Sequence, residues 1–298
     1  MHNYGYLLFM ALFLSTSNLV HAGPHDDAPD RGIIVQRALS SDPALTYFLY
    51  VPTQLAAAAP LLVDVHGISR NAGEHIAGFA PFAERYGVVV LAPLFSKERF
   101  PDYQRLGRKG RGLRADLALQ QMIKEVGQLT GAKTEKVYLF GFSGGAQFVH
   151  RYLMAYPKQV ASAVIASAGW YKLPDEQRRY PTGIKPNPDL PDIRFDPSQF
   201  LTVPACVVVG DLDTRRGSAL RKNKKIDKQQ GVSRMERGQH WIEAMRAAAR
   251  NREMNTVYQF HTLPRSGHSF RRSMKHGNMG EIVFDFLFPA APAMVTGP

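Results

Sequence analysis

Short apolar runs rich in β-branched residues recur along this chain and alternate with segments of helical pattern. The runs PLLVDVHG at 60–67 and VVVLAP at 88–93 are almost continuously apolar, as in strands that are buried on both faces. Residues 72–87 and 113–129 have helical patterns instead. Strands that alternate with helices form a mostly parallel sheet with helices on both faces. We therefore expect an α/β fold that binds its ligands at the carboxyl ends of the strands.

The alternation continues to the end of the chain. We expect further strands at 136–140, 161–167, 206–210 and 255–263, and further helices from about Ala146, through 241–249 and near 281–288. The runs at 32–39 and 45–52 indicate two strands that pair, joined by a turn at Ser41-Asp42-Pro43. We find no internal repeat or low-complexity tract. Residues 23–298 are long enough for one large α/β domain or two small ones, and we expect a single domain at 23–298.

The first 22 residues have the pattern of a cleaved export signal. An apolar run at 6–14 is followed by polar residues at 15–18 and by Val20-His21-Ala22, which suits signal peptidase. We expect cleavage after Ala22 and a mature protein that is periplasmic or secreted. The single cysteine, Cys206, lies in the apolar run VPACVVVG, so the chain holds no internal disulfide and this side chain is expected to be buried.

The stretch GFSGG at 141–145 places a serine between glycines, where a strand pattern ends and a helical pattern begins. A serine at such a junction occupies a sharp, strained turn at the top of a sheet. Glycine at 141 and 145 allows the close approach that this turn requires. The N-terminus of the following helix favours negative charge that develops beside Ser143. The stretch therefore predicts a nucleophilic serine.

A serine nucleophile needs a base that takes its proton and an acid that orients the base. Asp213 follows the strand at 206–210, and His268 lies in the loop PRSGHSF after the strand at 255–263. Ser143, Asp213 and His268 thus occur in the order serine, acid, histidine, each just past a strand end. We expect these three residues to be catalytic.

Three further histidines and one further aspartate compete for these positions. They are His240, His261, His276 and Asp211. The first lies in a helical pattern and the second in a strand pattern, whereas placement in a loop favours His268. The competing aspartate would instead support the turn after its strand.

With these residues the chain resembles the α/β-hydrolase superfamily over nearly all of its mature region. In that family the acid commonly lies three residues after a strand-ending glycine, which matches Gly210 and Asp213. The family's histidine-glycine pair after the third strand matches His66-Gly67. Within the superfamily, HGISRNA is most similar to secreted polyhydroxybutyrate depolymerases and feruloyl esterases. Those enzymes often carry a cysteine where this chain has Ile68, together with nearby disulfides that it lacks.

The resemblance implies an α/β-hydrolase fold with an oxyanion hole formed by the backbone N–H groups of Ile68 and Gly144. It requires no metal and no organic cofactor. The expected pocket residues are His66, Phe142, Trp170 and Tyr171. For the last two, surface packing is the alternative. The pairs Asp64-x-His66 and Glu74-His75 match no zinc signature, so we expect structural roles for them.

Positive charge is concentrated in two segments of this chain, whose formal net charge is +12. Residues 97–114 hold seven Lys or Arg against two acids, and residues 215–228 hold seven against one. Both segments are expected to leave the sheet at the edge where Ser143 lies. One interpretation is ordinary solvated loops. The other is a positive rim that attracts acidic substrates or holds the protein on an anionic envelope. No recognised nucleic-acid motif accompanies the charge.

A proline-rich stretch at 171–200 carries six prolines between two expected core strands. An insertion of this length indicates a semi-rigid cap or lid over the pocket, or else a segment that packs along the side of the domain.

The sequence thus predicts an exported serine hydrolase that cleaves carboxylic esters through an acyl-serine intermediate. The substrate would be a small or polymeric ester. A serine peptidase or a polyester depolymerase would use the same three residues. From another class, the alternative is a non-catalytic protein of the same fold that binds envelope polyanions through its basic segments.

Overall fold

A computed structural model describes residues 29–289, so the expected leader at 1–22 and its cleavage site lie outside the described residues. In this part the strands are β1 Ile34–Leu39, β2 Asp42–Tyr50, β3 Pro60–Val65, β4 Val89–Leu94, β5 Lys133–Phe142, β6 Val160–Ala166, β7 Ala205–Gly210 and β8 Tyr258–Leu263. The helices are α1 Ala72–Tyr86, α2 Ala115–Thr130, α3 Gly144–Ala155, α4 Pro197–Phe200, α5 Lys224–Gln230, α6 Arg234–Arg250, α7 Phe270–His276 and α8 Met279–Leu287. Two single-turn helices are η1 Tyr103–Arg105 and η2 Pro157–Gln159.

The strands form one sheet in the order β1-β2-β4-β3-β5-β6-β7-β8. The hairpin of β1 and β2 pairs antiparallel, and β2 is also antiparallel to β4, whereas all strands from β4 to β8 run parallel. The chain steps from β3 to β4 in one direction and then crosses back to place β5 on the other side of β3. Ligands of such sheets bind where the order reverses, outside the carboxyl ends of the strands. The loops after β3 and β5 therefore border the expected site.

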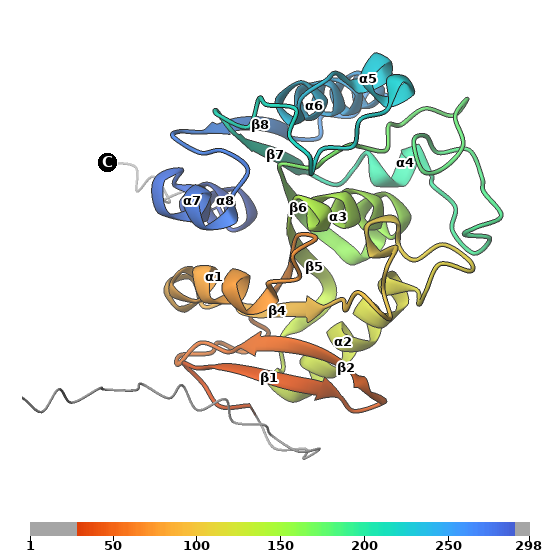
Figure 1. Ribbon diagram of the computed structural model, residues 1–298. Coiled ribbons are helices and arrows are strands. Elements are labelled where there is room, and N and C mark those ends of the chain that lie inside the picture. Colours follow the sequence, from red (N-terminus) through yellow and green to blue (C-terminus); the bar gives the residue numbers. More distant parts are fainter. Residues whose placement is uncertain (1–28, 290–298) are drawn as a thin grey trace, which may run out of the picture.

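Helices cover both faces of this sheet, as Figure 1 shows, with α1, α7 and α8 on one side and α2, α3 and α4 on the other. Each face has its own apolar core, because the inner strands are buried on both sides. The expected mostly parallel α/β architecture is confirmed. None of the helices within residues 29–289 has the length and apolar composition that spanning a bilayer requires.

The expected long elements are present, with ends shifted by a few residues. The hairpin turn is shorter than expected, since β2 already begins at Asp42. Three short helices, α4, α5 and α7, were not expected from the pattern. Each begins at a capping residue whose side chain accepts a backbone N–H bond, namely Asp196, Asn223 and Ser269. Helices of one or two turns present too few apolar repeats to be recognised by periodicity.

The proline-rich segment at 171–200 is tied to the basic segment at 97–114 at several points. The bonds are Tyr180 Oη to Arg105 O (2.7 Å), Lys109 N to Asp189 O (3.0 Å) and Arg114 Nη1 to Asp192 Oδ1 (2.7 Å). Apolar side chains of the proline-rich segment join the core on the α3 side, among them Ile184 and Leu190. Both excursions lie together at the right of Figure 1.

Candidate active site

Ser143 lies between the end of β5 and the first residue of α3, with φ 54° and ψ −105°. This positive φ is strained for a residue with a side chain. The flanking glycines make the turn feasible, because a Cβ on Gly141 would lie 2.5 Å from the carbonyl of Gly145. A Cβ on Gly145 would lie 1.9 Å from the carbonyl oxygen of Val65. The turn thus packs directly against the end of β3.

The structure brings Ser143, His268 and Asp213 into one hydrogen-bonded chain. His268 Nε2 lies 2.9 Å from Ser143 Oγ, and His268 Nδ1 lies 2.9 Å from Asp213 Oδ2. Asp213 is buried, and its other oxygen accepts a bond of 3.0 Å from the buried guanidinium of Arg234. The ring of Phe142 stacks against His268 with 5.2 Å between the ring centroids. The imidazole is therefore held at both nitrogens and on one face.

Asp211 has other partners. Its carboxylate is exposed and accepts bonds of 3.0 Å from the backbone N–H groups of Arg265 and Ser266, in the loop that leads to His268. The Ser266 N–H, together with that of Arg265, lowers the pKa of Asp211. This aspartate thus supports the turn, as the alternative reading of the sequence expected.

The three competing histidines do not contact this chain of residues. His240 is exposed on α6, His261 on β8 bonds to Gln259, and His276 ends α7. The sequence did not indicate a role for Arg234 at this site, because arginines are common at the start of solvent-exposed helices. Only the packing of α6 beside the β7 loop makes it a partner of Asp213.

The loop after β3 is held by His66, which is fully buried. Its Nδ1 lies 2.8 Å from the carbonyl oxygen of Gly67, and its Nε2 accepts a bond of 3.0 Å from the N–H of Phe95. Burial lowers the pKa of His66 to about 4, so the ring is neutral at pH 7. The N–H of Arg70 also donates to Gly67, at 3.1 Å.

These bonds fix the direction of the Gly67–Ile68 peptide. Since the N–H of a trans peptide points opposite to its C=O, the Ile68 N–H faces away from His66. It donates to no group in the part of the chain that is described. Ile68 Cγ2 would lie 2.9 Å from a Cβ on Gly144, so the two expected oxyanion-hole residues are neighbours. As the first residue of α3, Gly144 also has an N–H without a carbonyl acceptor in its own helix.

A hollow of about 390 Å³ opens at Ser143. The loop after β3, the start of α7 and Ala219 line it together with Ser143, His268 and Phe142. The other expected pocket residues lie elsewhere: His66 is buried under the loop, and Tyr171 stacks on Trp241 in the core. Trp170 is 4% exposed and lies against arginine side chains. No residue of 171–200 belongs to the described lining, and a capping role for that segment stays a prediction.

Asp64 and His75 form a buried pair, with 3.0 Å between Oδ1 and Nδ1, and His75 also lines the hollow at Ser143. The ring of His75 stacks on Phe270 at 3.8 Å between centroids. Burial raises the pKa of Asp64. Glu74 turns outward to Arg271, and His66 bonds only to backbone groups. Within residues 29–289 no group of three or more such side chains could hold a metal ion.

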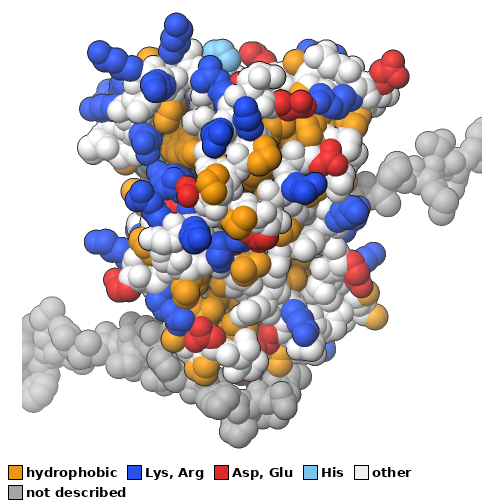
Figure 2. Space-filling view, turned by 90° about the vertical axis from the view of Figure 1, so that its right-hand side faces the viewer, with side chains coloured by type: hydrophobic (Ala, Val, Ile, Leu, Met, Phe, Trp, Pro, Cys, Tyr) orange, Lys and Arg blue, Asp and Glu red, His pale blue; other side chains and the backbone are white. Residues whose placement is uncertain are grey.

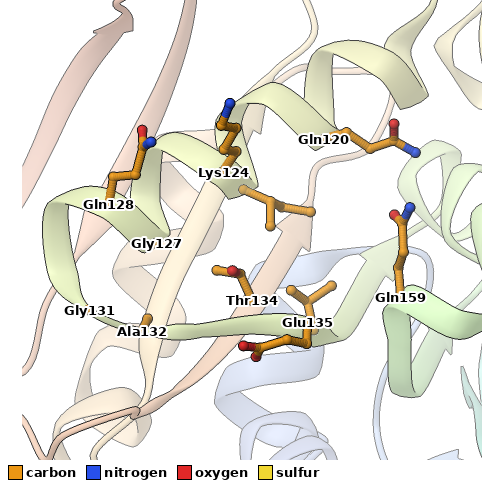
Figure 3. Close-up of a pocket in the computed structure, with 11 residues that line it drawn as sticks. Gln120, Lys124, Gly127, Gln128, Gly131, Ala132, Thr134, Glu135 and Gln159 are labelled. Carbon is orange, nitrogen blue, oxygen red and sulfur yellow. The ribbon is translucent and has the colours of Figure 1, made fainter.

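A larger hollow, of about 590 Å³, lies between α2 and the start of β5. Figure 3 shows that Gln120, Lys124 and Gln128 reach it from α2, Thr134 and Glu135 from β5, and Gln159 from η2. Its described lining has no serine, cysteine or histidine. The hollow at Ser143 is smaller, but Ser143 and His268 line it.

Comparison with known proteins places the chain in a family. The family model described as Esterase PHB depolymerase matches residues 45–256, which is more than half of the chain. The chain belongs to this family. The match spans β2 through α6 and therefore includes Ser143 and Asp213. The expected similarity to polyhydroxybutyrate depolymerases and feruloyl esterases is confirmed.

One relative of this chain is a feruloyl esterase B from Talaromyces funiculosus, and the two sequences are 28% identical over 124 aligned residues. The alignment covers 40% of this chain and 35% of the relative. The chain thus spans about a third of that curated relative's length. The structure of poly(aspartic acid) hydrolase-1 from Sphingomonas sp. KT-1 has a TM-score of 0.67 and 26% identity, and the match covers 78% of this chain and 93% of that one.

A poly(3-hydroxybutyrate) depolymerase from Bordetella parapertussis has a TM-score of 0.70 at 23% identity, covering 88% of this chain and 91% of its own. At this identity the likeness concerns the fold alone. The mostly parallel sheet with its helices is thus the α/β-hydrolase fold.

Proposed function

We propose that this family member hydrolyses carboxylic esters, with Ser143 as nucleophile, His268 as base and Asp213 as the group that orients the imidazole. The observation that supports this most is the hydrogen-bonded chain from Ser143 Oγ through His268 to Asp213, with 2.9 Å at each step. The Asp213 carboxylate accepts the Nδ1–H bond and thereby leaves Nε2 free to take the serine proton. Membership of an esterase family supports the same reaction.

In the proposed mechanism, Ser143 Oγ attacks the ester carbonyl while its proton passes to His268. The negative charge of the tetrahedral intermediate falls on the former carbonyl oxygen, which the N–H groups of Ile68 and Gly144 stabilise. Protonated His268 then gives its proton to the departing alcohol, and an acyl-serine remains. Water, deprotonated by the same histidine, releases the acid and restores Ser143.

The substrate we propose is a small or polymeric ester that carries negative charge. Figure 2 shows the face of the molecule that holds residues 97–114, after β4, and residues 171–200, after β6. Lys and Arg side chains gather along one side of this face. We refer to segments 97–114 and 215–228 together as the basic rim, which would raise the local concentration of acidic substrates or hold the protein on an anionic envelope.

Amide bonds in an acidic polymer are a second candidate. The name of the Sphingomonas relative gives poly(aspartic acid) as its substrate. Since serine triads cleave both esters and amides, the basic rim suits such a polymer as well.

We also propose that the protein is exported and loses residues 1–22. The apolar run and the Val20-His21-Ala22 site support this. Mass spectrometry of protein recovered from the periplasm or medium tests it, because the mature chain should begin at Gly23. A chain that retained Met1 in the cytoplasm would contradict it.

The decisive experiment is labelling of the purified protein with a fluorophosphonate probe, beside Ser143→Ala, followed by hydrolysis of short and long p-nitrophenyl esters. We expect labelling of the parent alone and a loss of at least about a thousandfold in kcat for the variant. A folded parent that neither labels nor hydrolyses any ester would contradict the proposal and favour a non-catalytic binding protein.

A further inference from the structure

Trp170 lies four residues beyond the end of β6, and three guanidinium groups surround its indole ring. The distances from guanidinium carbon to ring centroid are 4.3 Å for Arg151, 5.6 Å for Arg105 and 5.7 Å for Arg221. We refer to these four residues as the arginine cluster. Its arginines come from η1, from α3 and from the loop before α5, so both basic segments meet at one aromatic ring. Cation–π attraction to the Trp170 ring offsets part of the repulsion between the three positively charged guanidinium groups.

The charge in the arginine cluster is only partly balanced. Arg151 is fully buried; its Nη1 donates to the carbonyls of Gln104 and Gln147, while its Nε and Nη2 have no partner. Burial lowers its pKa to about 10. Within the described residues neither Arg151 nor Arg221 forms an ion pair with a carboxylate. Asp102 pairs with Arg105, but it is shared with Arg108. A buried, unpaired guanidinium is costly, so an anion bound here would be stabilised.

The arginine cluster lies about two helical turns from Ser143 along α3. Ser143, Gln147 and Arg151 follow one another at intervals of four residues along one face of α3, so Arg151 is about 12 Å from Ser143 along the helix axis. Between them, Gln104 Nε2 would lie 2.9 Å from a Cβ on Gly144. On the other side, Ala219 lines the hollow at Ser143 two residues before Arg221.

Solvent reaches the arginine cluster through two of its members. The side chain of Arg105 is 20% exposed, and Arg221 is exposed. Trp170 and Arg151 form the buried floor behind them. An anion would therefore first meet Arg221 and Arg105, of which Arg105 is paired with Asp102. Behind them lies the buried Arg151, whose Nε and Nη2 have no partner.

We propose that the arginine cluster is a carboxylate subsite, which binds an acid group carried by the substrate at a distance from the ester that Ser143 cleaves. This rests on the proposed function and gives it a substrate class, namely esters of dicarboxylic acids or acidic oligomers. Guanidinium groups suit the site, because each offers paired N–H donors that match the two oxygens of a carboxylate.

The test compares monoesters of p-nitrophenol with suberic or adipic acid against octanoate and hexanoate esters of equal chain length. The readout is the ratio of kcat/KM for the acidic ester to that for the neutral ester. We expect a ratio above one in the parent, a loss of about tenfold in that ratio for Arg221→Gln, and partial recovery for Arg221→Lys.

Lys222→Gln is the matched control, since it removes the same charge from the next residue of the same loop. We expect this variant to leave the ratio within about twofold of the parent. Equal losses in Arg221→Gln and Lys222→Gln would overturn the subsite, because they would point to the general field of the loop. A parent ratio of one would overturn it as well.

Calorimetric titration of suberate into Ser143→Ala separates the two proposals. If Ser143→Ala binds suberate and the double variant Ser143→Ala/Arg221→Gln does not, the subsite is supported. If the parent in addition hydrolyses no ester, only the esterase function is contradicted. If the parent hydrolyses neutral esters but Ser143→Ala binds no suberate, the esterase function is supported and the carboxylate subsite is contradicted.

Discussion

Asp211 and Asp213 are two positions apart, yet their partners differ completely. Asp213 is buried between His268 and Arg234, whereas Asp211 is exposed and holds the backbone of the loop before His268. Any catalytic effect of an acid at this turn should therefore belong to Asp213 alone.

We predict that Asp213→Asn lowers kcat by about ten-thousandfold, because an amide in this position donates to Nδ1 and stabilises the wrong imidazole tautomer. Asp211→Asn, the matched control, should stay within about threefold of the parent. Both are measured as kcat on one p-nitrophenyl ester, with circular dichroism to verify folding. Similar losses in the two variants would contradict the assignment of Asp213.

At the scale of elements, the site depends on how closely the β5–α3 turn approaches β3. Gly145 leaves no space for a side chain, since its Cβ would meet the Val65 carbonyl at 1.9 Å. Gly217, in the loop after β7, has open space around its Cβ position and a permissive backbone. A methyl group added at Gly145 should therefore be destabilising, whereas one added at Gly217 should have little effect on stability.

We predict that Gly145→Ala lowers the free energy of unfolding by at least about 3 kcal/mol, because the strand end or the turn must shift. Gly217→Ala should change it by no more than about 0.5 kcal/mol. Urea unfolding followed by tryptophan fluorescence measures both values. A Gly145→Ala protein as stable and active as the parent would show that the turn is not constrained by β3.

At the scale of the whole molecule, positive charge lies in two segments far apart in sequence, which meet at Trp170. The field of such a surface acts over roughly a Debye length and is therefore screened by salt. Contacts within the arginine cluster are less exposed and should be screened less.

We predict that kcat/KM for an acidic ester falls about tenfold between about 0.02 and 0.5 M NaCl, while the value for a neutral ester of equal length stays within about twofold. Initial rates at low substrate concentration measure both. If the two esters respond to salt equally, the basic rim does not steer acidic substrates, and its charge is that of ordinary solvated loops.

The sequence by itself determined the order of the strands and long helices, and it placed Ser143 and His268 in turns that follow strand ends. Apolar periodicity and glycine placement are local properties, because they depend on backbone sterics within a few residues. The same dependence on local patterns explains why the short helices α4, α5 and α7 were not expected, because one or two turns hold too few apolar repeats.

Only the tertiary structure decided which distant side chains become partners. The sequence favoured Asp213 over Asp211, but only the packing shows that Arg234 is its second partner. The arginine cluster is likewise assembled from three elements around Trp170. The placement of 171–200 against 97–114 is of the same kind. Such contacts depend on how the sheet twists and how helices pack on it, and no short pattern in a single chain carries that information.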